Sequence, residues 1–164
     1  MKFYIELNEF KDSEDRQVLA KCSSNTNLLG ELAYIASQEN DDELADMLAS
    51  NEHLDKKIIS LFADSEFATI RWYAAQDSRI GIDDLKKLSC DEDEEVKMEV
   101  TYNPTVTEEI LCRLSCDPSD DIKIEVIKSD KVTIPILTAM AKSSSNSSRV
   151  RLLAYDRREE LFTK

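Results

Sequence analysis

The amino-acid sequence repeats itself at an interval of about 26 residues, which is typical of folds built from stacked copies of one supersecondary unit. This repeat limits the possible folds more than any other feature of the chain. One apolar column of the repeat consists of Val18, Leu44, Ile70, Val96 and Ile122, with Val150 following after a slightly longer interval. A column of small or apolar residues lies four positions later, at Cys22, Leu48, Ala74, Val100, Val126 and Ala154.

Three further columns follow in each copy. A column of turn-forming residues holds Asn25, Asn51, Asp77, Asn103 and Ser129. A second apolar column, three positions later, holds Leu28, Leu54, Ile80, Val106 and Val132. The last column holds Ile35, Leu61, Leu88, Leu114 and Met140, if a one-residue slip is allowed between the second and third copies. Agreement of five columns over five copies predicts a repeat protein with one continuous apolar core.

The second half of each copy has the pattern of a short helix. Between Thr107 and Cys116, apolar residues fall at helical spacing. The first position of this segment carries residues that suit a helix N-cap, namely Asp55, Gly81, Thr107 and Thr133. An apolar residue precedes each cap and another lies four positions after it, which is the pattern of a hydrophobic staple. A helix is therefore predicted to start after each of these positions.

The first half of each copy is less uniform. Asp91 and Asp117 are the expected caps of residues 96–102 and 122–128, two stretches that alternate apolar and polar residues as a strand does. The equivalent stretches ELADMLAS and TIRWYAAQ are rich in Ala and Leu and favour a helix. We therefore expect an all-α fold with two helices per copy. A repeat of one strand and one helix is the alternative.

The composition supports helices, because 164 residues contain only 2 Gly and 3 Pro. The length corresponds to one ordinary domain, which we expect to span residues 1–164. Repeat proteins need capped ends. We assign residues 1–17 to an N-terminal cap, residues 18–149 to the repeats, and residues 150–164 to a partial repeat that closes the C-terminal end.

The stretch DEDEEVKMEVTYNPTVTEEILCRLSCDPSDDIKIEV resembles the leucine-rich repeat variant, a bacterial relative of HEAT repeats. The matching residues are Val96, Lys97, Val100, Asn103, Pro104, Leu111, Leu114 and Asp117. The match extends over residues 64–142 and is looser over 18–63, and several copies lack the Asn-Pro pair. The resemblance implies a right-handed α-solenoid of five to six HEAT-like repeats. One relative holds an iron–sulfur cluster on N-terminal cysteines; because only Cys22 lies in that region, we expect neither a metal nor a cofactor.

Acidic residues outnumber basic ones by 34 to 21, which gives a net charge of -13. Nucleic acids and anionic membranes need a basic surface, so we expect neither as a partner. The sequence shows no signal peptide and no apolar run that could span a bilayer, and we expect a cytoplasmic protein with reduced cysteines. It contains no phosphate-binding loop and no catalytic motif, so we do not expect an enzyme.

The loop that joins one copy to the next is acidic. Stacked copies would align these carboxylates along one edge, and the candidate residues for partner binding there are Asp91, Glu92, Asp93, Glu94, Glu95, Asp117, Asp120 and Asp121. Acidic residues also stabilise helix N-termini, so a purely structural role is the alternative. The functional hypothesis is a monomeric, non-catalytic scaffold whose acidic edge docks a basic protein. An inhibitor or immunity protein for a basic toxin would be a special case.

Two other groups of residues bear on binding. A basic column of Arg71, Lys97, Lys123 and Arg151 follows the first core column, and HEAT-like repeats use such a column to bond neighbouring repeats. The aromatic residues Trp72, Tyr73 and Tyr102 would form a binding patch together with Arg71 if they face outward. Packing between helices is the alternative for Trp72.

The cysteines offer a second functional class. Cys112 and Cys116 share one helix face, and Cys90 occupies the position equivalent to Cys116 one copy earlier. The alternative function is therefore a metal or redox protein that uses these three thiols, although small buried residues are the simpler interpretation. We expect Cys22 to be a core residue. The lone His53 is expected to be an exposed turn residue, because no partner for a catalytic triad is evident.

Overall fold

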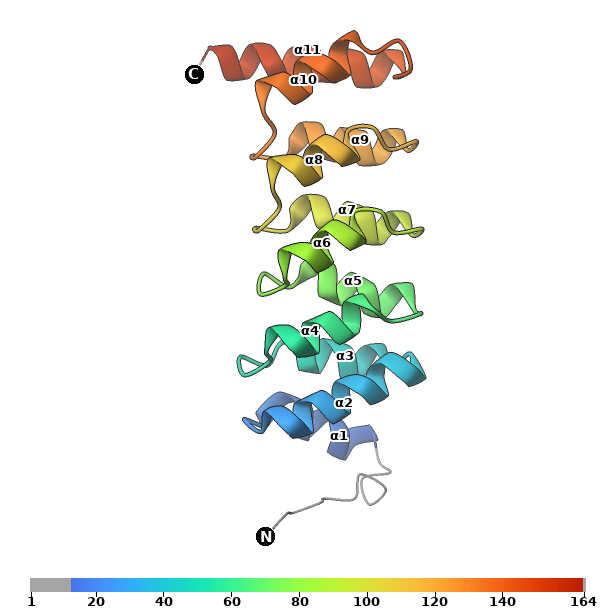
Figure 1. Cartoon of the computed structure of the whole chain (residues 1–164), viewed down its shortest axis with the longest axis vertical. Coiled ribbons are helices and arrows are strands. Elements are labelled where there is room, and N and C mark those ends of the chain that lie inside the picture. The colour runs from blue at the N-terminus through green and yellow to red at the C-terminus, as the bar shows by residue number, and fades with distance from the viewer. Residues whose placement is uncertain (1–12, 164) are drawn as a thin grey trace. The chain divides into compact units, whose positions relative to one another are not determined.

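Helices are the only regular secondary structure in the computed structural model, which describes residues 13–163. The eleven helices of these residues are α1 (Ser13–Cys22), α2 (Thr26–Glu39), α3 (Asp42–Ala49), α4 (Lys56–Ala63), α5 (Ala68–Gln76), α6 (Ile82–Leu88), α7 (Glu94–Tyr102), α8 (Glu108–Leu114), α9 (Asp120–Lys128), α10 (Ile134–Lys142) and α11 (Ser148–Phe162) (Figure 1). The all-α expectation is confirmed over this range. The strand alternative is wrong, because residues 96–102 lie in α7 and residues 122–128 form most of α9.

The chain divides into two units, Met1–Gly81 and Ile82–Lys164. Within the first unit, α1, α3 and α5 pack side by side, and α2 packs on α4 (Figure 1). Within the second unit, α7 packs on α9 and α9 on α11, while α6, α8 and α10 each pack on the odd-numbered helix that follows. Residues 1–12, most of the predicted N-terminal cap, lie outside the described residues. The single-domain expectation remains a prediction.

The helix boundaries follow the period of the sequence. The helices α3, α5, α7 and α9 begin at residues 42, 68, 94 and 120, and α4, α6, α8 and α10 begin at 56, 82, 108 and 134. In both series each helix start lies about 26 residues after the previous one, which is the period of the sequence repeat. The period read from apolar columns is therefore also the period of helix starts within each unit.

Most columns are buried, but the last one is corrected by the structure. The buried residues at its place are Ala36, Phe62, Leu88, Leu114 and Met140, which are equally spaced along the chain. The predicted members Ile35 and Leu61 are the neighbours of Ala36 and Phe62, and Leu61 is exposed. The slip was wrong because two adjacent apolar residues in a helix are about 100° apart and only one of them can face the core.

The first helix departs from the repeat. Val18 and Cys22 occupy core columns in the sequence, yet both are exposed, and Ala20 is the buried residue of α1. Residues two positions apart lie on nearly opposite sides of a helix, so α1 is rotated relative to its equivalents. The prediction of Val18 and Cys22 as core residues was wrong.

The predicted caps are partly confirmed. Asp55 caps α4 by accepting hydrogen bonds from the N–H groups of Lys57 and Ile58, both at 3.0 Å. Thr107 accepts one from Ile110 at the start of α8, whereas the hydroxyl of Thr133 makes no such bond in α10. The helices α4, α6, α8 and α10 begin directly after Asp55, Gly81, Thr107 and Thr133, as the staple pattern predicted.

The caps of α7 and α9 are two residues later than predicted. Asp93 and Ser119 are the N-cap residues, not Asp91 and Asp117. The Oδ1 atoms of Asp91 and Asp117 instead accept hydrogen bonds from the N–H groups of Asp93 (2.9 Å) and Ser119 (2.8 Å). Each predicted cap therefore closes a turn that leads into the helix.

The turn column makes the same side-chain hydrogen bond in every copy, at the N-cap of α2 for Asn25 and in a turn before the next helix for the other four. The side-chain oxygens of Asn25, Asn51, Asp77, Asn103 and Ser129 each accept a hydrogen bond from the N–H group two residues later. Asn51 is buried and also donates from Nδ2 to the carbonyl oxygens of Ala20 (2.7 Å) and Ser23 (2.9 Å). One side chain thus closes its own turn and satisfies carbonyls at the end of α1.

Substitution of Asn51 should destabilise the first unit. Asn51→Ala leaves buried carbonyl and N–H groups without their partner, and we expect a loss of about 2–3 kcal/mol in the free energy of unfolding. Urea denaturation followed by circular dichroism measures this loss. Asn27→Ala, at an exposed position of α2, is the control and should change stability by less than about 0.5 kcal/mol. Equal stability of the two variants would contradict the role assigned to Asn51.

Candidate interaction surface

The acidic residues before α7 divide into two kinds. Asp91 and Asp93 are used by the backbone, the first in the turn and the second as N-cap, where its Oδ1 accepts from the N–H groups of Glu95 (2.9 Å) and Val96 (3.2 Å). Glu92, Glu94 and Glu95 are exposed. Two of the five predicted acidic residues therefore hold the loop in shape, and three present carboxylates to solvent.

The acidic residues before α9 divide in the same way. Asp117 closes the turn and pairs with Lys97 of α7, with Nζ and Oδ2 2.8 Å apart. These two side chains are only 10% and 12% exposed, so this is a mostly buried ion pair between successive helix pairs. Asp120 lies 3.6 Å from Lys123, and Asp121 is exposed.

The structure brings the two acidic loops together. Glu94 Oε2 accepts a hydrogen bond from the hydroxyl of Ser119, 3.4 Å away, which links the first turn of α7 to the N-cap of α9. The Lys97–Asp117 ion pair joins the same two segments. The acidic side chains of residues 91–95 and 117–121 thus lie at one edge of the second unit, which we call the acidic edge. Each loop precedes a helix whose first turn is acidic.

Each of the four residues of the basic column has a partner within its own unit. Arg71 is buried and donates to the backbone carbonyl oxygens of Ser65 (3.0 Å) and Glu66 (2.9 Å). Lys97 makes the ion pair with Asp117, as expected for bonding between repeats. Lys123 is buried beside Asp120, and Arg151 donates to the hydroxyl of Ser148 at 3.2 Å.

The predicted aromatic patch is divided between the two units. Trp72 and Tyr73 are half-buried neighbours in α5, with ring centroids 5.3 Å apart in an edge-on arrangement. Tyr102 is an exposed residue of the second unit. Arg71 does not face outward with these rings, because its guanidinium is bound to the backbone of its own loop.

The environment of Tyr102 alters its acidity. Burial of the hydroxyl and a hydrogen bond to Glu125 raise the pKa of Tyr102 to about 12, and the charges of Glu125 and Glu99 contribute further. Burial alone raises the pKa of Glu99. At Glu125 burial acts to raise the pKa, but hydrogen bonds from Lys128 and Tyr102 outweigh it and lower the pKa. This polar group links α7 to α9 at residues that the sequence did not single out, apart from Tyr102.

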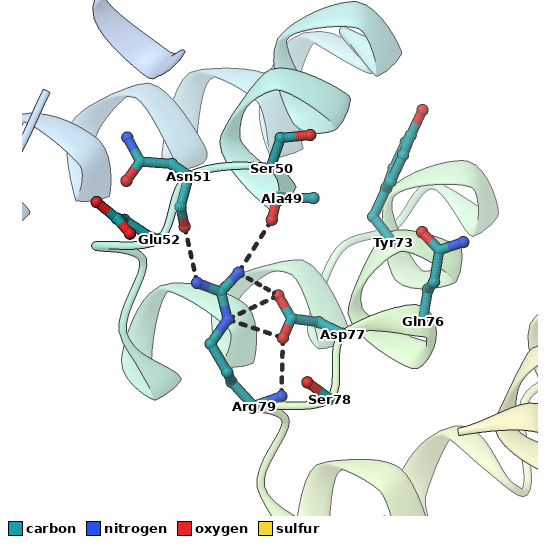
Figure 2. A pocket seen from close by; sticks show the side chains of 9 residues that line it. All are labelled: Ala49, Ser50, Asn51, Glu52, Tyr73, Gln76, Asp77, Ser78 and Arg79. Atoms are coloured by element: carbon teal, nitrogen blue, oxygen red, sulfur yellow. Dashed lines mark hydrogen bonds and ion pairs between the residues drawn. The ribbon is translucent and has the colours of Figure 1, made fainter. Parts of the chain in front are cut away.

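A surface cavity of about 360 Å³ opens in the first unit (Figure 2). Its lining consists of Ala49, Ser50, Asn51, Glu52, Tyr73, Gln76, Asp77, Ser78 and Arg79. Burial and the nearby charges of Asp46 and Asp42 raise the pKa of Tyr73 on its wall. The guanidinium of Arg79 is held by Asp77, with Nη2 and Oδ2 2.6 Å apart, and this hydrogen bond raises the pKa of Arg79.

Arg79 substitutes for an asparagine amide. Its Nη2 donates to Ala49 O (3.0 Å) and its Nη1 to Asn51 O (2.7 Å), as Figure 2 shows. Ala49 O lies one repeat after Ser23 O, the carbonyl that the Asn51 amide satisfies. Asp77 stands where Asn51 stands one copy earlier, and its carboxylate cannot donate. Arg79 therefore supplies the missing N–H groups at the end of α3.

The second unit has a related contact that does not reach a helix end. Ser129 occupies the turn column, and Lys131, at the position of Arg79, donates from Nζ to the carbonyl oxygens of Pro104 and Val106 in the loop after α7. Val106 O corresponds to Leu54 O, which Arg79 also reaches, at 3.3 Å. Where the turn residue is asparagine, the position two residues later carries no long cation: His53 follows Asn51, and Thr105 follows Asn103. Arg79 and Lys131 were not predicted from the sequence, although each is a cation two positions after a turn residue other than asparagine.

The cysteines do not form the predicted group. All four are exposed, so the interpretation of Cys90, Cys112 and Cys116 as small buried residues is wrong. Among residues 13–163, no three His, Cys, Asp or Glu side chains are placed to hold a metal ion. Cys90 Sγ accepts a hydrogen bond from Arg113 Nη1 at 3.0 Å. His53 lies in a turn with its side chain half exposed, as expected.

Comparisons with protein-family models, with curated proteins and with solved structures found no match for this chain. None of the described helices is long and apolar enough to cross a lipid bilayer.

The compensation by Arg79 predicts a dependence between two substitutions. Arg79→Ala should lower the free energy of unfolding by about 2–4 kcal/mol, because it removes an ion pair and the donors to buried carbonyls. Adding Asp77→Asn to Arg79→Ala should recover about 1–2 kcal/mol, since the new amide can reach Ala49 O and restore one hydrogen bond. Urea denaturation of the two variants measures the difference. A double variant less stable than Arg79→Ala would contradict the interpretation that Arg79 takes the place of an asparagine amide.

The raised pKa of Tyr102 predicts a pH dependence. Because the native pKa of about 12 exceeds the unfolded value of about 10, the contribution of Tyr102 to stability is present below pH 10 and is lost as the pH rises toward 12. A titration of the tyrosine ¹³Cζ signals should show Tyr102 ionising near pH 12. Glu125→Gln should lower this pKa, since it removes a negative charge beside the phenol. An unchanged titration in that variant would contradict the contribution of Glu125.

Proposed function

We propose that the chain is a non-catalytic protein-interaction scaffold whose acidic edge docks a basic protein. The observation that carries the proposal is the set of exposed carboxylates of Glu94, Glu95 and Asp121, which form no ion pair with any Lys or Arg among residues 13–163. Lys97 and Lys123, the cations nearest along these helices, are directed to Asp117 and Asp120. A positively charged partner would neutralise these exposed carboxylates.

Helix stabilisation alone does not account for all these charges. Glu94, Glu95, Asp120 and Asp121 lie in first turns, where each carboxylate stabilises the helix by roughly 0.3–1 kcal/mol. The backbone N–H groups at the start of α7 already have Asp93 as their acceptor. Further like charges at the same edge repel each other, and this repulsion is relieved when a cationic surface binds. The acidic edge therefore carries more negative charge than the capping of α7 requires.

The charge distribution of the second unit supports a directed encounter. Residues 82–130 carry 15 acidic and 6 basic residues, whereas residues 131–164 carry 3 acidic and 7 basic ones. Clustered charge of one sign raises the rate at which oppositely charged proteins meet and lowers the rate for like-charged ones. The partner is thus selected by its basic surface, and nucleic acids and anionic membranes are disfavoured at this edge.

We propose for the whole chain a right-handed α-solenoid of five to six repeats, similar to the leucine-rich repeat variant and HEAT-like repeats. The constant interval of helix starts and the Lys97–Asp117 ion pair between successive helix pairs support this arrangement. Within this proposal the chain acts as a monomeric cytoplasmic scaffold, in which packed helices hold the acidic edge in place. Inhibition of a basic toxin is the special case that this chemistry would serve.

The acidic edge can be tested without disturbing its loops. The variant Glu94→Gln, Glu95→Gln, Asp121→Asn removes three charges and keeps the Asp91 turn, the Asp93 cap and the Asp117 ion pair. Affinity capture from lysate of the source cell, followed by identification of the captured proteins, should yield basic proteins with the wild type and at least tenfold less of them with the variant. Capture by the wild type should also fall as salt rises from about 0.1 M to about 1 M, where the screening length shortens from about 10 Å to about 3 Å.

The matched control removes the same charge from the first unit. Glu14→Gln, Glu31→Gln and Glu52→Gln change three exposed carboxylates outside the acidic edge, so this variant should capture as much as the wild type. If the two triple variants lose capture equally, net charge and not the acidic edge determines binding. If neither loses capture, the proposed site is wrong.

A further inference from the structure

The last helix presents an apolar stripe to solvent. Leu152, Tyr155 and Phe162 of α11 are 61%, 49% and 64% exposed. Their spacing of three and then seven places them on one side of a helix, because three or four residues make about one turn. Glu159, which is also exposed, lies on the same side between Tyr155 and Phe162. Val150 and Ala154, which are buried, mark the opposite side that packs into the second unit.

The equivalent stripe on the preceding odd-numbered helix is buried. One repeat before Leu152 and Tyr155 stand Ile124 and Ile127 of α9, which are 5% and 4% exposed. The core residues before Val150 and Ala154, Ile122 and Val126, are buried like their counterparts. The α9 helix packs between α7 and α11. The exposed stripe of α11 therefore has the position and the apolar chemistry of a surface that elsewhere in this unit is covered by helices.

Two arginines border the stripe. Arg151 stands at the position of Lys97, whose partner Asp117 comes from the next helix pair. Arg151 has Ser148 as hydrogen-bond partner and no carboxylate within ion-pair distance among residues 13–163. Arg158 lies over the ring of Tyr155, 4.7 Å from its centroid, and also pairs with Glu159. Of the two arginines, Arg151 thus lacks the carboxylate that Lys97 receives, whereas Arg158 already has Glu159.

We propose that this face of α11, formed by Leu152, Tyr155 and Phe162 with Arg151 and Arg158, docks an acidic amphipathic helix of a partner protein. The apolar side chains supply the contact area, Arg151, which has no carboxylate partner among residues 13–163, selects a carboxylate of the partner, and the ring of Tyr155 is already fixed under the guanidinium of Arg158, which Glu159 holds. Its charge preference is opposite to that of the acidic edge, so the proposal is independent of the basic partner proposed above.

A second copy of the chain fits this face less well. Two α11 helices that paired antiparallel about a twofold axis would bring the same border of each helix together. Arg151 and Arg158 of one copy would then adjoin those of the other, and like charges at a contact oppose association. The carboxylates of an acidic helix would instead be attracted to the arginines at this border.

The test uses two fluorescent synthetic peptides as probes, each long enough for about five helical turns. Both carry Leu at positions i, i+3, i+7 and i+10; one has Glu and the other Lys at the flanking positions. Fluorescence anisotropy with the full chain should show binding of the Glu peptide and at least tenfold weaker binding of the Lys peptide. Leu152→Ser should weaken binding of the Glu peptide at least tenfold, and Arg151→Glu should reverse the preference between the peptides.

The chain offers a matched control in the neighbouring leucine. Leu153 is 37% exposed on another side of α11, so Leu153→Ser should leave binding within about twofold of the wild type. Both substitutions are at exposed positions, and circular dichroism checks that the variants remain folded. The proposal is overturned if the two serine variants bind alike, if the Lys peptide binds as well as the Glu peptide, or if neither peptide binds. Concentration-dependent dimerisation lost in Leu152→Ser, or sedimentation with phosphatidylglycerol vesicles lost in that variant, would also overturn it by assigning the face to another occupant.

Discussion

The C-terminal carbonyl groups of each short helix need hydrogen-bond donors, and this need organises the connections between helix pairs. Asn51 meets it for α1 from a turn that lies one repeat later, and Arg79 meets it for α3. Because the donor comes from the next repeat, a bond that satisfies a helix end also joins neighbouring helix pairs. Short helices have many such ends per residue, so the turn column contributes to the fold as directly as the apolar columns do.

Much of the fold could be predicted from the sequence, because period and burial are linked. An apolar residue at one fixed interval predicts a helix pair at the same interval, and the helix starts follow it. The register of α1 could not be predicted in this way, since both Val18 and Ala20 suit a core. At Leu61 and Phe62 two adjacent apolar residues competed for one buried position, and hydrophobicity alone does not decide between them. Alternation of apolar and polar residues suggested only the strand alternative at residues 122–128, where a helix was predicted and found; it arises because tertiary packing buries both sides of much of α9.

The candidate surface was less predictable than the fold. The sequence places eight carboxylates in the loops before α7 and α9 and in the first turns of these helices, but it does not separate those that bind the backbone from those that face solvent. Asp93 and Asp117 have the same side chain as Asp121, and only the path of the loop decides that the first caps a helix, the second pairs with Lys97 and the third is exposed. Arg79 was missed because its role depends on which residue stands two positions earlier. Local composition therefore predicted an acidic edge, and hydrogen bonding determines which of its members are available.

The paired positions 77 and 79 restrict the order in which mutations can accumulate. A repeat with asparagine in the turn tolerates many residues two positions later, because the amide already serves the carbonyls of the preceding helix. Replacing that asparagine by aspartate first would strip those carbonyls of their donor, whereas gaining the arginine first is harmless and makes the later change permissible. Once both are present, as Asp77 and Arg79 are, the arginine cannot be lost before the aspartate has reverted to asparagine. Copies that began with identical turns would thus become committed to different residues. A segment exchange that brought the aspartate into a copy without the arginine would leave the carbonyl groups of the preceding helix without their donor.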